Sequence, residues 1–381
     1  MAGLYIHIPF CKSRCIYCGF YSTTADHLRQ RYVDALCMEA RQRPTDLPIE
    51  TIYLGGGTPS QLAPAQLRQL FDALYNIYKV SSSAEVTIEC NPDDVTADYA
   101  TALSQLPVNR VSMGAQTFDD QRLRFLHRRH TASQVPQAVR RLREAGIRNI
   151  SIDLMYGFPD ETLDDWQHDI DAALSLDVDH LSAYCLMIEE GTALYELMKK
   201  PPCLGGETKP SLNREDLGGS EELERQMYEH LIDRLTAAGY EHYEISNFAR
   251  PGLRSRHNNS YWTDIPYIGL GAAAHSYDGH QRRWNPDDIH LYIKGIETGH
   301  PESESEPIDD ATHYNDRVML SLRTCEGLDL SSLTAQDTAY LLPLAQKYLD
   351  EELLVLSGNH LRLSRQGLFV SDMVMADLMR V

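Results

Sequence analysis

The chain has 381 residues, with 35 Lys and Arg against 55 Asp and Glu, so its formal net charge is −20 at pH 7. This acidic excess argues against a nucleic-acid partner, because phosphate binding needs a basic face. The composition is 43% hydrophobic and 24% charged, as in ordinary globular proteins, and no apolar run is long enough to span a bilayer. We therefore expect a globular protein that contacts a membrane only through a partner.

The first half of the chain alternates short apolar segments with amphipathic ones. Strands are predicted at residues 4–9, 50–54, 85–90, 110–116, 149–156 and 180–187, and helices at 26–43, 63–79, 97–106, 133–145 and 162–176. Such alternation predicts parallel strands with right-handed crossovers, since parallel neighbours need a covering connection. The six strands predict an α/β fold with a partial (βα)6 barrel. A closed eight-stranded barrel, with residues 241–249 as a further strand, is the alternative.

The second half of the chain predicts a smaller C-terminal domain. Residues 199–220 combine Pro, Gly and charge without periodicity and predict a surface insertion, before a helix at 221–238. The acidic, proline-bounded residues 299–307 predict a linker, which divides the chain into a barrel with its extension at 1–300 and a domain at 301–381. The order helix, helix, hairpin, helix in that domain predicts a winged-helix-like arrangement. Its 6 basic and 14 acidic residues favour a packing or partner-contact role over DNA binding.

Three cysteines follow the first predicted strand within eight residues: Cys11, Cys15 and Cys18. A loop this short turns three sulfurs toward one point, and thiolates select zinc or iron–sulfur clusters. A structural zinc site would want a fourth Cys or His nearby, and three neighbouring cysteines do not pair evenly into disulfides. The spacing therefore predicts a metal site with one open position. The five scattered cysteines fit a reducing cytoplasm, with no secretory signal.

The second predicted strand runs directly into Gly55-Gly56-Gly57-Thr58-Pro59-Ser60. Three consecutive glycines at the carboxyl end of a strand let backbone groups approach a ligand closely, and ligands of α/β sheets bind at that edge. A plain turn, which needs only one glycine, is the structural alternative.

Polar side chains also stand at the ends of three further strands: Glu89, Gln116 and Asp153. In a barrel such side chains point into the ligand-binding mouth, where a carboxylate suits hydroxyl or ammonium groups. Each could equally cap the following loop, and Asn91-Pro92-Asp93-Asp94 makes capping a real alternative for Glu89.

Two further clusters carry weaker signals. Four arginines form a basic cluster in this acidic chain and could meet ligand carboxylates, or line a solvated helix face: Arg122, Arg124, Arg128 and Arg129. His257 opens the segment His-Asn-Asn-Ser-Tyr-Trp, ahead of the glycine-rich residues 269–275. A histidine with flat aromatic neighbours suits haem, and a hydrogen-bonded loop histidine is the alternative for both His257 and His275.

Taken together, these motifs resemble in order and spacing the oxygen-independent coproporphyrinogen III oxidase family of the radical S-adenosylmethionine (SAM) superfamily, over nearly the whole chain. The resemblance implies the open barrel, a 4Fe–4S cluster on the three thiolates, and SAM chelated to the free iron. It implies cluster ligands Cys11, Cys15 and Cys18, and SAM contacts Tyr5, Tyr17, Gly56, Gly57, Thr58 and Glu89. Positions that meet a second SAM in the oxidase correspond to Gln116, Arg128 and Asp153.

Two features depart from the oxidases. The oxidases have a cysteine motif of the form C-x3-C-x2-C-x-C and an N-terminal extension over the active site. In this chain Phe20 stands at the fourth cysteine position, and only ten residues precede Cys11. The segment 257–262 instead resembles the signature of a sister group of haem chaperones, which bind haem and pass it to acceptor proteins. The departures make oxidase activity doubtful.

Two hypotheses follow. In the first, the protein is a cytoplasmic carrier that binds the cluster, SAM and haem and delivers haem to an acceptor protein, as a homodimer or at a membrane-associated partner. This hypothesis counts His257 among the cofactor-binding residues and predicts weaker haem binding in His257→Ala. In the second, the protein is an oxidase that cleaves SAM to a radical and decarboxylates a porphyrinogen. The retained Gln116, Arg128 and Asp153 motivate the second hypothesis.

Overall fold

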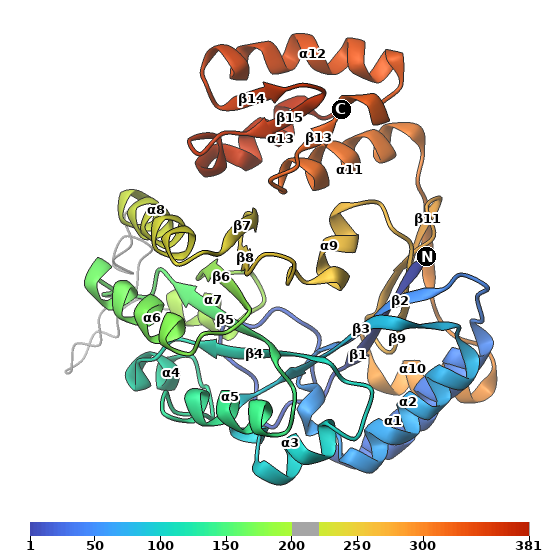
Figure 1. Cartoon of the computed structure of the whole chain (residues 1–381). Helices are drawn as coiled ribbons and strands as arrows, with labels where there is room; N and C mark the ends of the chain where they lie inside the picture. The colour runs from blue at the N-terminus through green and yellow to red at the C-terminus, as the bar shows by residue number, and fades with distance from the viewer. Residues whose placement is uncertain (200–220, 381) are drawn as a thin grey trace.

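The computed structural model describes residues 1–199 and 221–380 (Figure 1). The predicted insertion at 199–220 lies, apart from Lys199, outside the described residues. None of the described helices combines the length and apolarity that crossing a membrane requires.

Six parallel strands form the centre of one 12-stranded sheet, and they are neighbours in chain order. They are β1 (Ala2–Ile8), β2 (Ile49–Gly56), β3 (Val80–Cys90), β4 (Arg110–Gln116), β5 (Asn149–Tyr156) and β6 (His180–Cys185). The outer strands β1 and β6 pair with β9 (Tyr267–Leu270) and β8 (Asn247–Ala249), not with each other. The partial, open form of the barrel is thus confirmed. Residues 241–249 do not supply a barrel strand, because they form β7 (Glu241–Glu244) and β8, which run antiparallel at the β6 edge.

Helices cover the outer face of the parallel strands (Figure 1). They are α1 (Arg29–Gln42), α2 (Pro64–Ile77), α3 (Ala97–Leu103), α4 (Asp120–Phe125), α5 (Gln134–Glu144) and α6 (Leu163–Ser175). Three of them start at a side-chain N-cap in which an oxygen accepts a backbone N–H: Thr96 for α3, Asp119 for α4 and Thr162 for α6. Helices α7 (Ala193–Lys199) and α8 (Glu221–Ala237) follow β6.

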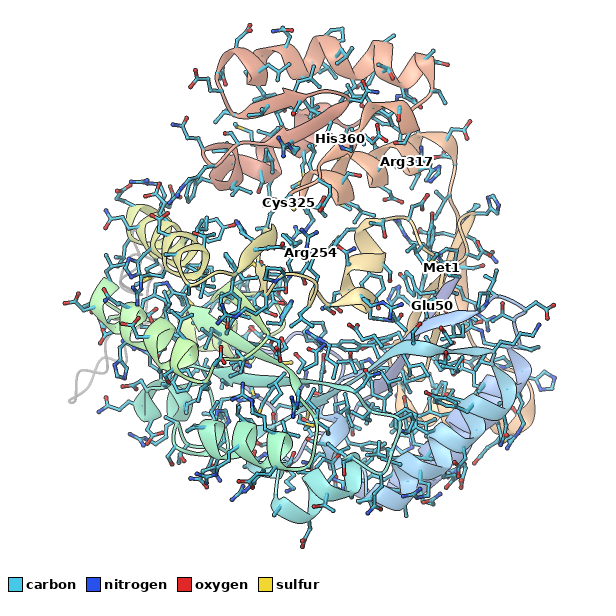
Figure 2. All side chains as sticks on the ribbon, in the orientation of Figure 1. Met1, Glu50, Arg254, Arg317, Cys325 and His360 are labelled. Carbon is cyan, nitrogen blue, oxygen red and sulfur yellow. The ribbon has the colours of Figure 1, made fainter. Side chains whose placement is uncertain are left out.

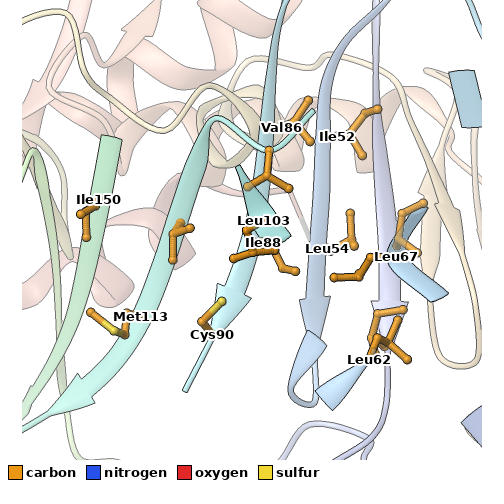
Figure 3. Close-up of a cluster of buried hydrophobic side chains, with 14 of the residues drawn as sticks. Ile52, Leu54, Leu62, Leu67, Val86, Ile88, Cys90, Leu103, Met113 and Ile150 are labelled. Atoms are coloured by element: carbon orange, nitrogen blue, oxygen red, sulfur yellow. The ribbon is translucent and has the colours of Figure 1, made fainter. Parts of the chain in front are cut away.

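Alternation along the strands sorts side chains between the two faces of the sheet. Ile52, Leu54, Val86 and Ile88 are fully or almost fully buried on the outer face, where they pack with helix residues such as Leu67 (Figure 3). The alternate residues, which apart from Gly55 are polar or aromatic, line the inside of the partial barrel: Tyr53 and Gly55 on β2, Glu85, Thr87 and Glu89 on β3, Arg110 and Ser112 on β4. The outer face therefore holds the core, and the inner face holds the polar groups.

A short helix closes the amino-terminal end of this polar interior. The helix α9 (Arg256–Trp262) lies against β2 and follows β8. Glu85 accepts hydrogen bonds from the backbone N–H groups of Arg256 and His257, both at 3.0 Å. Beyond α9 the chain forms β9, β10 (His275–Tyr277) and β11 (Gln281–Trp284), and then α10 (Ile289–Thr298), which packs on α1.

Residues 299–307, predicted as a linker, contain the strand β12 (Glu304–Pro307), which pairs antiparallel with β11 at one end of the sheet. The C-terminal elements are α11 (Asp310–Leu322), β13 (Leu328–Asp329), α12 (Ala335–Asp350), β14 (Leu354–Ser357), β15 (His360–Leu363) and α13 (Ser371–Leu378). They have a hydrophobic core of their own and a three-stranded sheet in the order β13-β15-β14. This C-terminal domain shows the predicted order of helices and hairpin.

The C-terminal domain also contacts the sheet near its opposite end. Arg323 pairs with Glu244 of β7 at 2.8 Å, and the backbone of Thr324 forms an isolated antiparallel bridge with Glu244. Arg254 reaches up to Cys325 and Glu326, with its guanidinium 2.7 Å from the Glu326 carboxylate (Figure 2). On the β11 side, Arg282 pairs with Asp316 of α11. The domain is thus held at both ends of the sheet.

Candidate functional site

The cysteine loop follows β1 and is fixed by backbone hydrogen bonds to three other segments. The N–H of Cys11 donates to Thr23 at 2.9 Å, and Ile16 donates to Leu126 at 3.3 Å. The carbonyl of Ile16 accepts from Leu194 at 2.8 Å. The loop therefore lies at the carboxyl ends of the parallel strands, between the ends of β4 and β6.

Two thiols of the loop have a polar side chain as neighbour. The Cys11 sulfur is 3.3 Å from Thr58 Oγ1, and the Cys15 sulfur accepts from the Arg128 guanidinium at 3.6 Å. Burial raises the pKa of the Cys11 and Cys18 thiols, and each also feels the charge of Cys15. In the described part of the chain, no three Cys, His, Asp or Glu residues are placed to hold one metal ion. A 4Fe–4S cluster needs no such group, because each cysteine binds a different iron. The partly exposed thiols fit a cluster.

The glycine turn after β2 lies directly against this loop. Gly57 donates to the carbonyl of Ile8 and Thr58 donates to that of Phe10, both at 2.9 Å. A β-carbon on Gly57 would lie 2.7 Å from the backbone of Pro9, so only glycine fits there. Gly56 has φ 106°, in the region that favours glycine. The structure thus brings the two sequence motifs into contact.

Glu89 stands at the end of β3 and faces the same turn. Its carboxylate accepts from the Tyr53 hydroxyl at 2.8 Å and from the Gly56 N–H at 3.2 Å. Burial raises the pKa of Glu89 to about 7, and the charge of Asp153 acts in the same direction. Tyr5 on β1 stacks on Tyr53 at 6.3 Å, and its hydroxyl is 3.0 Å from His7 Nδ1. This corner offers one partly exposed carboxylate beside the glycine turn.

Gln116, Arg128 and Asp153 converge at the ends of β4 and β5. Gln116 has φ 67° and lies where the register between β4 and β5 shifts at a bulge. A β-carbon on Gly114 would touch the side chains of both Gln116 and Arg128, so these two side chains lie close together. Arg128 donates to the Gly114 carbonyl at 2.7 Å and to Asn91 at 2.9 Å. Burial raises the pKa of Asp153, and hydrogen bonds with Ser182 and Ser112 act in the opposite direction. These residues are close enough to meet one ligand.

The four predicted arginines have four different surroundings. Arg122 pairs with Asp165 at 3.0 Å, and Arg129 pairs with Asp93 at 2.9 Å. Arg128 contacts the Cys15 thiol. Arg124 is exposed and has no ion pair with any described residue. A single basic cluster is therefore not what the structure shows.

Tyr17, in the cysteine loop, packs against a small apolar cluster of Leu126, Met155 and Phe158. Burial raises the pKa of its hydroxyl, which also lies near Arg128 and Cys15. The ring therefore helps to hold the loop against the ends of β4 and β5.

His257 is 0% exposed and lies at the opposite end of the interior. Its Nδ1 is 2.8 Å from Thr51 Oγ1, and its Nε2 is 2.8 Å from the Tyr261 hydroxyl. The ring stacks on Tyr53 at 5.2 Å, and burial lowers the pKa of His257 to about 3. Since both nitrogens are engaged, this arrangement leaves no lone pair free for haem iron. His275 is exposed and stacks on Trp284 at 5.8 Å.

Sequence reasoning missed two residues of the interior. Arg110 opens β4 and is only 1% exposed, yet its Nε and one terminal nitrogen have no hydrogen-bond partner among the described residues. Its charge lowers the pKa of Glu89 and Asp153 against the effect of their burial. His7 is buried with its pKa lowered to about 4 by desolvation. Strand alternation could have found His7, which stands between Ile6 and Ile8, but Arg110 follows Asn109 at the start of its strand and carries no such signal.

Comparison with known proteins defines the class of protein. The profile of the radical SAM superfamily matches residues 5–173, and that of the HemN C-terminal domain matches residues 308–370. The solved structure of coproporphyrinogen III oxidase (HemN) from Escherichia coli, described as a radical SAM enzyme, superposes with a TM-score of 0.84 over 99% of this chain and 90% of that one, at 22% identity. The chain has the radical SAM fold of HemN.

Sequence relatives define the family more narrowly. The haem chaperone HemW of Bacillus subtilis is 38% identical over 342 residues, which span 86% of this chain and 85% of that protein. The haem chaperone HemW of Lactococcus lactis is 34% identical, over 85% of this chain and 82% of that protein. This chain therefore belongs to the HemW family, a branch of the radical SAM superfamily.

Proposed function

We propose that the protein binds a 4Fe–4S cluster, SAM and haem, and transfers haem to acceptor proteins in the cytoplasm. The observation that carries the proposal is the contact between the cysteine loop and the glycine turn, in a chain of the HemW family. The names of the relatives supply haem and its transfer.

The thiols of Cys11, Cys15 and Cys18 would hold the cluster. Bound there, the cluster would supply an iron with a free position for SAM. The loop is kept in place by its own hydrogen bonds, and the Arg128 guanidinium would offset negative charge on Cys15.

The other site residues would hold SAM from the side of the strands. The backbone of Gly56 and Gly57 and the Thr58 hydroxyl face the loop, and Glu89 is positioned by Tyr53 to accept a hydroxyl or ammonium hydrogen bond. Tyr5 and Tyr17 are packed at the two flanks of this region. Gln116, Arg128 and Asp153 would meet the same SAM or a second one.

Haem titration of the anaerobically reconstituted chain tests the proposal. We expect saturable binding of one haem per chain, followed by transfer to apomyoglobin at a rate that depends on acceptor concentration. Transfer no faster than release of haem into buffer, or the absence of saturable binding, would contradict the carrier function.

The second candidate is coproporphyrinogen III oxidase activity, and the grouping of Gln116, Arg128 and Asp153 beside Cys15 favours it. An anaerobic assay with SAM, a reductant and coproporphyrinogen III tests this candidate. Decarboxylated product above a Cys15→Ser control would support it, and product at the level of the control would rule it out.

A further inference from the structure

We propose that haem docks on an exposed surface beside the cysteine loop, with its apolar macrocycle on Phe20 and Met187 and its two carboxylates at Arg14 and Arg124. We call these four residues the mouth surface. The proposal rests on the proposed function, since it assigns a place to the haem that the chain would carry.

Two large apolar side chains stand open to solvent on adjacent segments. Phe20 is 69% exposed and Met187 is 66% exposed, the highest values among the described apolar residues. Phe20 stands two residues after Cys18, at the end of the cysteine loop. Leu186, next to Met187, packs in the same apolar cluster as Tyr17 of the cysteine loop. Exposed apolar area of this kind, next to a candidate site, is typical of a binding surface.

The two segments also touch through Gly19 and Glu189. A β-carbon on Gly19 would lie 2.4 Å from a carboxylate oxygen of Glu189, so the side chain of Glu189 reaches the backbone next to Phe20. Phe20 and Met187 therefore belong to one surface although 166 residues separate them in the sequence.

Two exposed arginines, without an ion pair to any described residue, stand on the cysteine loop and on the helix whose end is bonded to it. Arg14 is exposed and stands in the cysteine loop itself, between Cys11 and Cys15. Arg124 lies two residues before Leu126, whose carbonyl accepts from Ile16 of the same loop at 3.3 Å. Neither arginine has an ion pair with any residue that the structure describes, although Asp and Glu outnumber Lys and Arg by 55 to 35.

The distribution of charge favours haem over an apolar peptide as the occupant. Haem has one flat apolar body and two carboxylates on one edge, and this surface has one apolar pair and two free guanidinium groups, which bind carboxylates well. The Glu189 carboxylate at Gly19 would repel haem carboxylates. We therefore expect the carboxylate edge to point away from Glu189, toward Arg14 and Arg124.

The test is haem titration of the full chain, reconstituted with its cluster, in four variants. Phe20→Ala/Met187→Ala removes the apolar pair, and Arg14→Gln/Arg124→Gln removes the two charges. Matched controls elsewhere on the surface are Met373→Ala, where the side chain is 49% exposed, and Arg68→Gln, where it is also exposed. Each titration is repeated with haem dimethyl ester, which lacks the two carboxylate charges.

We expect the apolar double variant to bind both haem and its ester about tenfold more weakly, because it loses two buried apolar contacts. The arginine double variant should bind haem about tenfold more weakly and the ester unchanged. Both controls should bind as the unchanged chain does. Circular dichroism of each variant should match the unchanged chain, because all the altered side chains are exposed.

Three results would overturn the assignment. Equal haem affinity in all variants, with the unchanged chain binding haem saturably, would place the haem elsewhere and leave the proposed function standing. Loss of ester binding in the arginine variant would show that the arginines do not act on carboxylates. No haem binding by the unchanged chain would remove both this surface and the proposed function.

Discussion

The two ends of the barrel interior treat their polar side chains in opposite ways. At the amino-terminal end, His257 is fully buried and both of its ring nitrogens have hydrogen-bond partners. At the carboxyl-terminal end, the three thiols are partly exposed and the glycine turn leaves backbone groups beside them. The first end is closed and fully hydrogen-bonded, whereas the second leaves thiols and backbone groups accessible. The His-Asn-Asn-Ser-Tyr-Trp segment, which suggested haem from its sequence, therefore lies at the end that is closed.

The largest effect should come from the open end. Replacing Cys15 with Ser removes one of the three proposed cluster ligands, so we expect the iron and sulfide content after anaerobic reconstitution to fall to near zero. Cys325→Ser is the matched control, because that thiol is exposed and lies against Arg254, away from the loop. If Cys15→Ser kept a full complement of iron, the thiol loop would not be the cluster site.

At the closed end, His257→Ala should cost stability instead of haem affinity. The change removes a buried ring and strands the hydroxyls of Thr51 and Tyr261, which should lower the free energy of unfolding by about 3–5 kcal/mol. Urea unfolding measures the loss. Haem titration of the folded fraction of this variant distinguishes a structural role of His257 from a haem-binding role. A folded variant that no longer binds haem would show that His257 binds haem. Tyr261→Phe, which removes one partner and keeps the ring, should cost only about 1 kcal/mol.

A pH dependence distinguishes the buried carboxylates from the buried histidines. The pKa of Glu89 is raised to about 7, so its folded form binds a proton that the unfolded chain releases at lower pH. This proton stabilises the folded chain below the pKa of the unfolded chain, and the stabilisation is lost as the pH rises to about 7. The loss in the free energy of unfolding is about 3 kcal/mol. Glu161, whose pKa is also raised to about 7, contributes with the same sign.

The buried histidines act with the opposite sign. The pKa of His7 is lowered to about 4 and that of His257 to about 3, so their contributions are lost as the pH falls below about 6.5. The informative quantity is therefore the difference between the unchanged chain and Glu89→Gln, measured by urea unfolding at pH 5, 6, 7 and 8. The unchanged chain should lose stability relative to the variant as the pH rises. A difference that stays constant with pH would contradict the raised pKa.

The smallest effect should come from Phe20→Cys, which places a thiol at the fourth position of the oxidase pattern. Because the side chain is 69% exposed, the free energy of unfolding should change by less than about 0.5 kcal/mol. Porphyrinogen turnover in the anaerobic assay should stay at the level of the unchanged chain. A gain of turnover would show that this one position separates a carrier from an enzyme.

Much of the barrel could be predicted from the sequence, because buried strands and amphipathic helices have distinct periods. The ranges 110–116 and 149–156 match β4 and β5 at both ends. The family resemblance implied that the cysteine loop and the glycine turn meet the same ligand, and their contact agrees with this, since both follow strands that are parallel neighbours. Local periodicity was enough for the strands and helices.

The remaining features depend on partners far away in the sequence. The acidic residues 304–307 have no apolar pattern, yet they form β12 because β11 offers an unpaired edge. The hydrogen bond between His257 and Thr51 joins residues 206 positions apart, so the sequence could suggest a ligand or a buried histidine but not choose between them. Arg110 escaped notice because a charged residue at the start of a strand is usually exposed.

The attachment of the C-terminal domain has a mechanical consequence. The domain continues from β12 and pairs with β11 through Arg282 and Asp316, at one edge of the sheet, and it grips Glu244 of β7 at the other. A partial barrel has no hydrogen bonds between its two edges to keep its width constant. Here the C-terminal domain, which has its own core, is bonded to both edges and bridges the gap between them. The distance between the edges therefore depends on this domain, and so does the room for cofactors between them. None of the described side chains of the domain belongs to the candidate site.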